Sequence, residues 1–206
     1  EALVIGTVIM SVKAATRSLK PEIVIVNDGS TDTTGKIARE TGATVLTHKL
    51  NRGLGASLGT GLNYAKLIQA DIAVTLDADG QHDPIDISRV IKPILNRQAD
   101  VVIGTRLKST QGHMPYDRFV VNWLSNFITW ILFGVWTTDS QSGFRAFSKR
   151  AVDYLQLKTQ RMEVSSEIFS EVRRHYLKLV EVPIRVIYTP YSRGKGQSTL
   201  NAFGVF

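Results

Sequence analysis

The stretch IAVTLDADGQHDP, residues 72–84, combines a strand, an acidic loop and the start of a helix. Its apolar, β-branched beginning, residues 72–76, predicts a buried strand. Asp83 is a residue type that caps helices, and Pro84 suits the first helical position, where a missing N–H has no consequence. The stretch therefore predicts a strand whose carboxyl end leads through an acidic loop directly into a helix.

The same order of strand, polar loop and helix recurs along the first half of the chain. Further buried strands are predicted from short apolar runs at 22–27, 44–48 and 100–104. Parallel strands need crossover helices, so the alternation predicts a mostly parallel, open α/β sheet flanked by helices. Such sheets bind ligands beyond the carboxyl ends of their strands. Because NDGSTD, NRGLG, DADGQ and GTR follow these strands, we expect a nucleotide-type pocket there.

Beyond residue 105 the alternation stops, but no shift in composition indicates a second domain. Helices are predicted at 116–136, 150–156 and 163–175. A final strand is predicted in LVEVPIRVIY, where Pro183 favours a position at the sheet edge. The aromatic-rich segment 119–136 fits either a core helix or a helix lying at a membrane interface.

Composition narrows the range of ligands. The chain has no cysteine, which excludes a disulfide scaffold, a thiolate zinc site and a cysteine nucleophile. Its net charge is +7, but the basic residues are scattered, and neither an RNA-binding aromatic signature nor a recognition-helix pattern is present. We therefore expect phosphorylated small molecules or lipid headgroups as partners, and no nucleic acid.

Asp77 and Asp79 form an acidic pair whose side chains face the same way in an extended segment. Two close carboxylates suit Mg²⁺ or Mn²⁺, although a pair of solvated turn residues gives the same pattern. An EF-hand is excluded because Gly80 and Ser88 stand at the wrong loop positions. A haloacid-dehalogenase-like phosphatase is a remote alternative, because Gln81 replaces its usual Thr or Val and the pair follows the third strand.

Asn27 and Asp28 form a second polar site at a strand end. Asp28 is placed to accept hydrogen bonds from a ring N–H or a ribose hydroxyl. An Asx-turn that caps the following helix explains the same residues equally well. The sequence leaves these two interpretations open.

Four blocks, IVNDGSTD, NRGLGASLGTGL, TLDADGQHDP and DSQSGFRAFS, together resemble family 2 inverting glycosyltransferases of GT-A fold. The most similar subgroup is the dolichyl/polyprenyl-phosphate hexosyltransferases, exemplified by dolichyl-phosphate mannose synthases. The resemblance covers nearly the whole chain. It implies one Rossmann-like catalytic domain over residues 1–206, with a nucleotide-sugar half at 1–105 and an acceptor half at 106–206. Family members begin with a further strand, which we expect to be missing from this sequence.

The resemblance also implies how the donor is bound. Asp77, Asp79 and Gln81 would hold Mg²⁺ or Mn²⁺ against the donor diphosphate. The implied nucleotide-sugar contacts are Asn27, Asp28, Asn51, Arg52, Gly53, Ala78 and Arg106. Asn27 stands where the family has an acidic residue, so the base contact is changed and the donor is left as UDP- or GDP-linked. His82 receives no role.

Basic residues in the second half are implied to bind the acceptor phosphate. Relatives grip the lipid phosphate with Arg and a Ser four residues later, and Arg118 and Asn122 have that spacing here. The other members of the implied acceptor-phosphate set are Arg145, Arg193, Lys195 and Ser198. Arginine suits this role because its fork of donors matches phosphate oxygens.

The implied activity is inverting transfer of a hexose from a nucleoside-diphosphate sugar to a polyprenyl (dolichyl) phosphate. We expect the reaction to take place on the cytoplasmic face of a membrane. The protein would be peripheral there, or anchored by segments outside this chain. Such an acceptor is already anionic, so positioning by Arg118 and its neighbours supplies much of the rate. A saccharide or glycolipid hydroxyl is the alternative acceptor and requires a base. Asp139 is the candidate base, unless it serves as a cap or pairs with Arg145. A non-catalytic nucleotide-binding module is a remote alternative.

Overall fold

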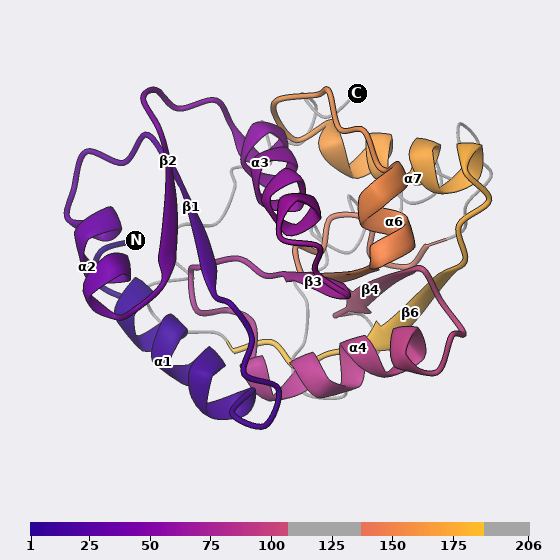
Figure 1. Cartoon of the computed structure of the whole chain (residues 1–206), viewed down its shortest axis with the longest axis horizontal. Coiled ribbons are helices and arrows are strands. Elements are labelled where there is room, and N and C mark those ends of the chain that lie inside the picture. Colours follow the sequence, from indigo (N-terminus) through magenta and orange to yellow (C-terminus); the bar gives the residue numbers. More distant parts are fainter. Residues whose placement is uncertain (107–136, 188–206) are drawn as a thin grey trace, which may run out of the picture.

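The computed structural model describes residues 1–106 and 137–187, which fold into two small sheets surrounded by helices (Figure 1). The strands are β1 (Val24–Asp28), β2 (Thr44–His48), β3 (Ile72–Thr75), β4 (Val101–Thr105), β5 (Arg145–Ser148) and β6 (Leu179–Pro183). The helices are α1 (Ile5–Ala15), α2 (Thr34–Glu40), α3 (Leu54–Leu67), α4 (Ile87–Leu95), α6 (Lys149–Tyr154) and α7 (Val164–Arg174), with a 3-10 turn, η1 (Pro84–Asp86), before α4.

The strands pair in a mixed pattern. β1 and β2 form a parallel pair, and the second sheet has the order β3-β5-β4-β6. In that sheet β4 and β6 are parallel, whereas β5 runs antiparallel to both of its neighbours. The predicted α/β class and the predicted strands of the first half are confirmed. The alternation of strands and helices did not predict the antiparallel β5, which follows the point where that alternation stops.

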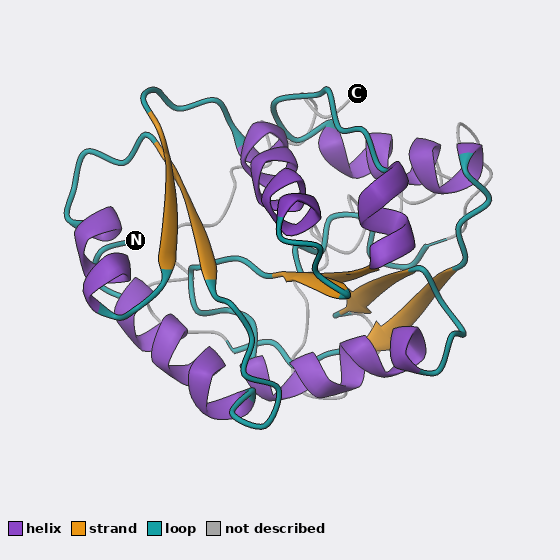
Figure 2. Cartoon of the chain, viewed as in Figure 1, coloured by secondary structure: helices purple, strands orange, loops and turns teal. Residues whose placement is uncertain are grey.

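Helices cover both faces of the four-stranded sheet (Figure 2). On one face Val102 and Ala146 pack with the apolar side of α4. On the other face Val101 and Phe147 pack with residues of α3, α6 and α7. Adjacent residues of one strand thus enter opposite cores, as the two-residue period of a strand requires. α1 and α2 form a third, smaller core beside β1 and β2.

Both helix-start signals and the edge-strand signal are confirmed. The Asp83 carboxylate accepts a hydrogen bond from the Ile85 N–H at 3.0 Å, and Pro84 opens η1. β6 lies at the edge of its sheet and ends at Pro183, where a missing N–H leaves no ladder bond unmade. The loop that holds the acidic pair is therefore fixed at both ends, by β3 before it and by η1 after it.

None of the helices within residues 1–106 and 137–187 has the length and apolar character needed to cross a membrane. The aromatic-rich segment 119–136 lies outside the described residues.

Candidate active site

The predicted donor-side residues lie where β1, β2, β3 and β4 end. The Asp28 carboxylate is in contact with the loop that follows β2. Its Oδ1 accepts hydrogen bonds from the His48 ring at 2.6 Å and the Arg52 N–H at 2.9 Å. Its Oδ2 accepts from the Gly53 N–H at 2.7 Å. Asp28 thus fixes the loop before α3, and its direct contact with a nucleotide stays a prediction.

His48 is a site residue that the sequence reasoning missed. It is paired with Asp28 in the β1–β2 register, and its Nε2 lies 2.9 Å from the Thr60 hydroxyl on α3. The signal was available, because two strands that end together bring their last side chains together. The Asp28–His48–Thr60 chain of contacts therefore connects both strand ends to α3.

The Asn27 side chain closes the turn after β1, but it does not cap the following helix, since α2 has Thr33 as its N-cap residue. The Asn27 side-chain oxygen accepts a hydrogen bond from the Ser30 N–H at 3.1 Å, and the residue is buried. Gly29 has φ +73°, and a Cβ there would lie 2.5 Å from the backbone nitrogen of Asn51. The turn after β1 is therefore packed directly on the loop after β2, at a distance that only glycine permits.

The charge of Asp28 gives a prediction about pH. Burial alone would raise the pKa of Asp28, but hydrogen bonds from Arg52, His48 and Gly53 outweigh it and hold the pKa below 3.8. A lowered pKa stabilises the fold above the unfolded value, and this contribution is lost as pH falls through the folded value. We expect Asp28→Asn to reduce the free energy of unfolding at neutral pH by an amount that shrinks on acidification below pH 3.8. Urea denaturation of both proteins across this range measures it. A difference that stays constant with pH would contradict the assignment.

The acidic loop after β3 has a defined geometry. The Asp79 carboxylate accepts a hydrogen bond from the Gln81 N–H at 2.9 Å, across Gly80 with φ +78°. The Asp77 Oδ2 lies 3.2 Å from the His82 Nε2. The Asp77 side chain is still 48% exposed, so it remains accessible to a ligand.

Cationic neighbours keep Asp77 ionised. Burial alone would raise its pKa, but the hydrogen bond from His82 and the nearby charges of Arg145 and Arg106 outweigh burial and lower it. Burial lowers the pKa of Arg145 to about 10, against the opposing effect of Asp77 and Asp139. Arg145 is therefore still protonated at neutral pH, and a negative Asp77 faces a positive environment.

The carboxylates of this loop fit a hard divalent cation whose coordination is completed by a substrate. Within the described ranges, no cluster of three or more His, Asp or Glu side chains could hold a metal ion alone. Asp77 and Asp79 would supply carboxylate oxygens, and Mg²⁺ typically adds substrate phosphates and water to one or two such ligands. That Gln81 contributes a ligand stays a prediction.

Asp139 is tied to Arg106. The Asp139 Oδ2 accepts from the Arg106 N–H at 3.0 Å and from Nε at 2.7 Å, and Oδ1 accepts from a terminal guanidinium nitrogen at 2.7 Å. Asp139 is fully buried. The pairing alternative thus holds, but with Arg106 in place of the expected Arg145. A carboxylate held by three donors and shielded from solvent is poorly placed to accept a substrate proton.

Arg145 is an internal residue of the site. It is 4% exposed, and its guanidinium donates to the Ser140 carbonyl at 3.1 Å and the Ser165 hydroxyl at 3.0 Å. The structure therefore gives Arg145 a structural place beside Asp77 and Asp139, and its contact with an acceptor phosphate stays a prediction.

Glu181 is a second residue that the sequence reasoning missed. From β6 it accepts hydrogen bonds from the Thr137 hydroxyl at 2.6 Å, the Thr138 hydroxyl at 2.9 Å and the Thr138 N–H. These contacts hold the segment that carries Asp139 against the edge strand. The signal was a single acidic residue inside an otherwise apolar strand, LVEVP.

Five predicted acceptor-side residues lie outside the described residues: Arg118, Asn122, Arg193, Lys195 and Ser198. Their roles stay predictions.

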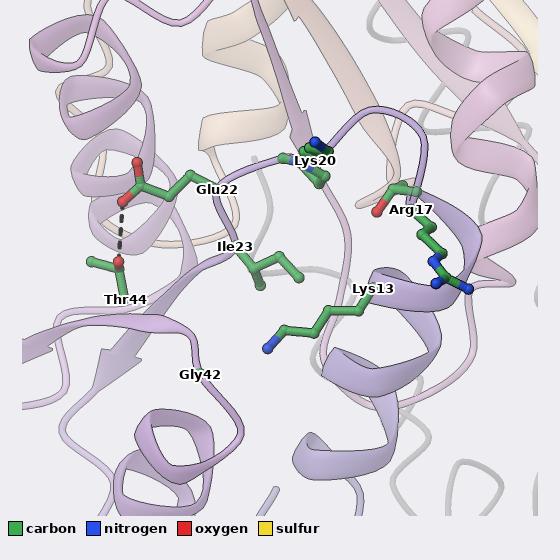
Figure 3. Close-up of a pocket in the computed structure, with 9 residues that line it drawn as sticks. Lys13, Arg17, Lys20, Glu22, Ile23, Gly42 and Thr44 are labelled. Carbon is green, nitrogen blue, oxygen red and sulfur yellow. Dashed lines mark hydrogen bonds between the residues drawn. The ribbon is translucent and has the colours of Figure 1, made fainter.

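A separate pocket of about 230 Å³ lies at the opposite, amino-terminal ends of β1 and β2 (Figure 3). Lys13, Arg17 and Lys20 line it together with Glu22. Lys13 donates a hydrogen bond to the Thr41 carbonyl at 2.6 Å. None of the residues at the carboxyl ends of the strands lines this pocket, so it is distinct from the candidate active site.

Several known proteins resemble this chain in sequence or in fold. The family model described as Glycosyl transferase family 2 matches residues 1–155. An uncharacterized protein of Methanocaldococcus jannaschii is 45% identical, covering 92% of this chain and 81% of that protein. The UDP-N-acetylglucosamine–dolichyl-phosphate N-acetylglucosaminyltransferase of Methanococcus voltae is 41% identical, covering 89% and 82%. The undecaprenyl-phosphate mannosyltransferase of Micrococcus luteus is 28% identical, covering 81% and 72%.

A similar solved structure is glucosyl-3-phosphoglycerate synthase from Mycobacterium tuberculosis in complex with Mn²⁺, uridine diphosphate and phosphoglyceric acid. It superposes with a TM-score of 0.73 over 99% of this chain and 70% of the synthase, at 19% identity. At this identity the likeness establishes a common fold.

Proposed function

Because this chain belongs to glycosyl transferase family 2, we propose that it transfers a sugar, with inversion, from a nucleoside-diphosphate sugar to a polyprenyl phosphate. Two relatives with named activities act on dolichyl and undecaprenyl phosphate. One of them, at 41% identity, is named for a UDP-linked donor, which favours UDP over GDP here.

The observation that carries the choice of acceptor is the burial of Asp139 against Arg106. A hydroxyl acceptor needs a base to take its proton. Asp139, the base predicted from the sequence, is fully buried and accepts three hydrogen bonds from Arg106. A phosphate oxygen is already anionic near neutral pH and needs no such base. This arrangement supports a phosphate acceptor over a saccharide or glycolipid hydroxyl.

On the donor side, Asp77 and Asp79 would hold Mg²⁺ or Mn²⁺ together with the donor diphosphate. The bound cation supplies compensation for charge that develops on the leaving diphosphate. The chain itself positions the parts: Asp28 fixes the loop at Arg52 and Gly53, and Arg145 keeps a positive charge beside Asp77. In-line attack then depends mainly on holding the acceptor phosphate and the sugar donor in the correct relative orientation.

A lipid-linked acceptor places the reaction at a membrane surface, and we propose its cytoplasmic face, where nucleotide sugars are available. The net charge of +7 favours contact with anionic headgroups. Arg118, Arg193 and Lys195 are the proposed acceptor-phosphate contacts, all outside the described residues.

A transfer assay with paired acceptors tests this function. Radiolabelled UDP-N-acetylglucosamine, UDP-glucose and GDP-mannose are each incubated with the protein, Mn²⁺ and either dolichyl phosphate or dolichol. We expect chloroform-soluble label with one of the UDP sugars and dolichyl phosphate only, and loss of that label with EDTA. Equal labelling of dolichol, or label confined to added saccharides, would instead favour the hydroxyl-directed alternative.

A further inference from the structure

His82 is the residue of the acidic loop that the proposed function leaves without a role. Its ring is buried, and the residue is only 6% exposed. The ring meets Phe144 edge-on, with centroids 5.3 Å apart and an interplanar angle of 63°. Its backbone forms an isolated antiparallel bridge with Val186, and the neighbouring Gln81 carbonyl accepts from the Ile187 N–H at 2.8 Å. Packing and backbone pairing therefore fix the ring in one position.

Among the described residues, Asp77 is the one polar partner of the fixed ring. The His82 Nε2 lies 3.2 Å from the Asp77 Oδ2. An ionised carboxylate can only accept, so Nε2 carries the hydrogen and donates. Among the described residues the buried Nδ1 has no hydrogen-bond partner. The ring is thus held by packing, and its hydrogen bonding is directed to Asp77 alone.

Asp77 is confined from the other side by Gly143. A Cβ at position 143 would lie 2.4 Å from the Asp77 Oδ1 and 2.5 Å from Oδ2, so only glycine lets the carboxylate occupy this place. Within residues 1–106 and 137–187, Oδ1 has no hydrogen-bond donor, and 48% of the side chain is exposed. One oxygen is held by His82, and the other is left open to a ligand.

We propose that His82 is a positioning residue that holds the Asp77 carboxylate, against Gly143, in the orientation that binds the divalent cation. The inference rests on the proposed function, because that function assigns the cation to Asp77 and Asp79. A partner that orients a metal-binding side chain typically contributes a 10–100-fold effect on metal affinity when it is removed. The competing explanation is that His82 only fills the core beside Phe144.

Two substitutions separate these explanations. His82→Phe keeps an aromatic ring against Phe144 but removes the donor. His82→Gln places an amide N–H close to the former Nε2 and restores the donor. The affinity for Mn²⁺ in the presence of UDP is measured from free Mn²⁺ by electron paramagnetic resonance, with thermal unfolding recorded alongside. We expect about 10–100-fold weaker Mn²⁺ binding in His82→Phe, and binding within about threefold of the parent in His82→Gln.

Unchanged Mn²⁺ affinity in His82→Phe would overturn the inference, as would equal weakening in both variants. Should His82→Phe not fold, His82→Asn replaces it, because its shorter amide does not reach Asp77. It should then weaken Mn²⁺ binding where His82→Gln does not. If the unsubstituted protein binds no Mn²⁺ with UDP, the metal part of the proposed function fails as well, whereas normal binding with an unaffected His82→Phe removes the positioning role alone.

Discussion

Asp79→Asn is expected to lower the rate of sugar transfer about a thousandfold at saturating donor and Mn²⁺. Its side-chain oxygen can still accept the Gln81 N–H, which lies 2.9 Å from the carboxylate, so the local turn is preserved. The substitution removes the negative charge that would help hold the cation on the donor diphosphate. Loss of about 4 kcal/mol of transition-state stabilisation, within the range of metal-ion catalysis, corresponds to this factor. Single-turnover rates with dolichyl phosphate measure it.

Asp83→Asn provides the matched control in the same loop. It removes an equal charge, but Asp83 caps η1 through the Ile85 N–H and lies 3.6 Å from the Arg185 guanidinium. A side-chain cap is preserved by asparagine. We therefore expect transfer within about threefold of the parent for this variant. Equal rates for Asp79→Asn and Asp83→Asn would show that Asp79 is no more than a turn residue.

The sequence predicted the strands and helices well where local pattern decides them. Residues 44–48 were predicted as a strand and form β2 with the same limits, and Asp83 caps the helix start as expected. The place of β5 between β3 and β4 was beyond such reasoning, because strand order depends on pairing between segments far apart in the chain. The periodicity of apolar residues shows which face of a strand is buried, but the same pattern fits a parallel and an antiparallel strand.

The candidate site shows the same limit at the level of side chains. The expectation that ligand-binding residues follow the carboxyl ends of strands led to Asp28, the last residue of β1, and to Asp77, just beyond β3, but it did not reveal their partners. Pairing of Asp139 with Arg145, six residues on, was the alternative to its role as a base, yet Asp139 pairs with Arg106, 33 residues before it. His48 and Glu181 were missed because their contacts depend on register and on long-range packing.

Arg106→Met is expected to lower the free energy of unfolding by about 3 kcal/mol. Asp139 is fully buried, and the substitution leaves its carboxylate without the two guanidinium hydrogen bonds of 2.7 Å. Removing one partner of a buried pair typically costs about 3–5 kcal/mol. We expect the lower end because Arg145 remains close enough to interact electrostatically with Asp139. Urea denaturation measures the difference.

Arg150→Met is the matched control for the loss of an arginine from an ion pair. Arg150 lies 3.3 Å from Asp100, but its side chain is 51% exposed, so the loss should stay below about 1 kcal/mol. The double variant Arg106→Met/Asp139→Leu removes the stranded carboxylate and should recover most of the lost stability. Recovery of the free energy of unfolding in the double variant would show that the loss in Arg106→Met comes from the unpaired charge of Asp139. A double variant as unstable as Arg106→Met would mean that other contacts of Arg106 carry the effect.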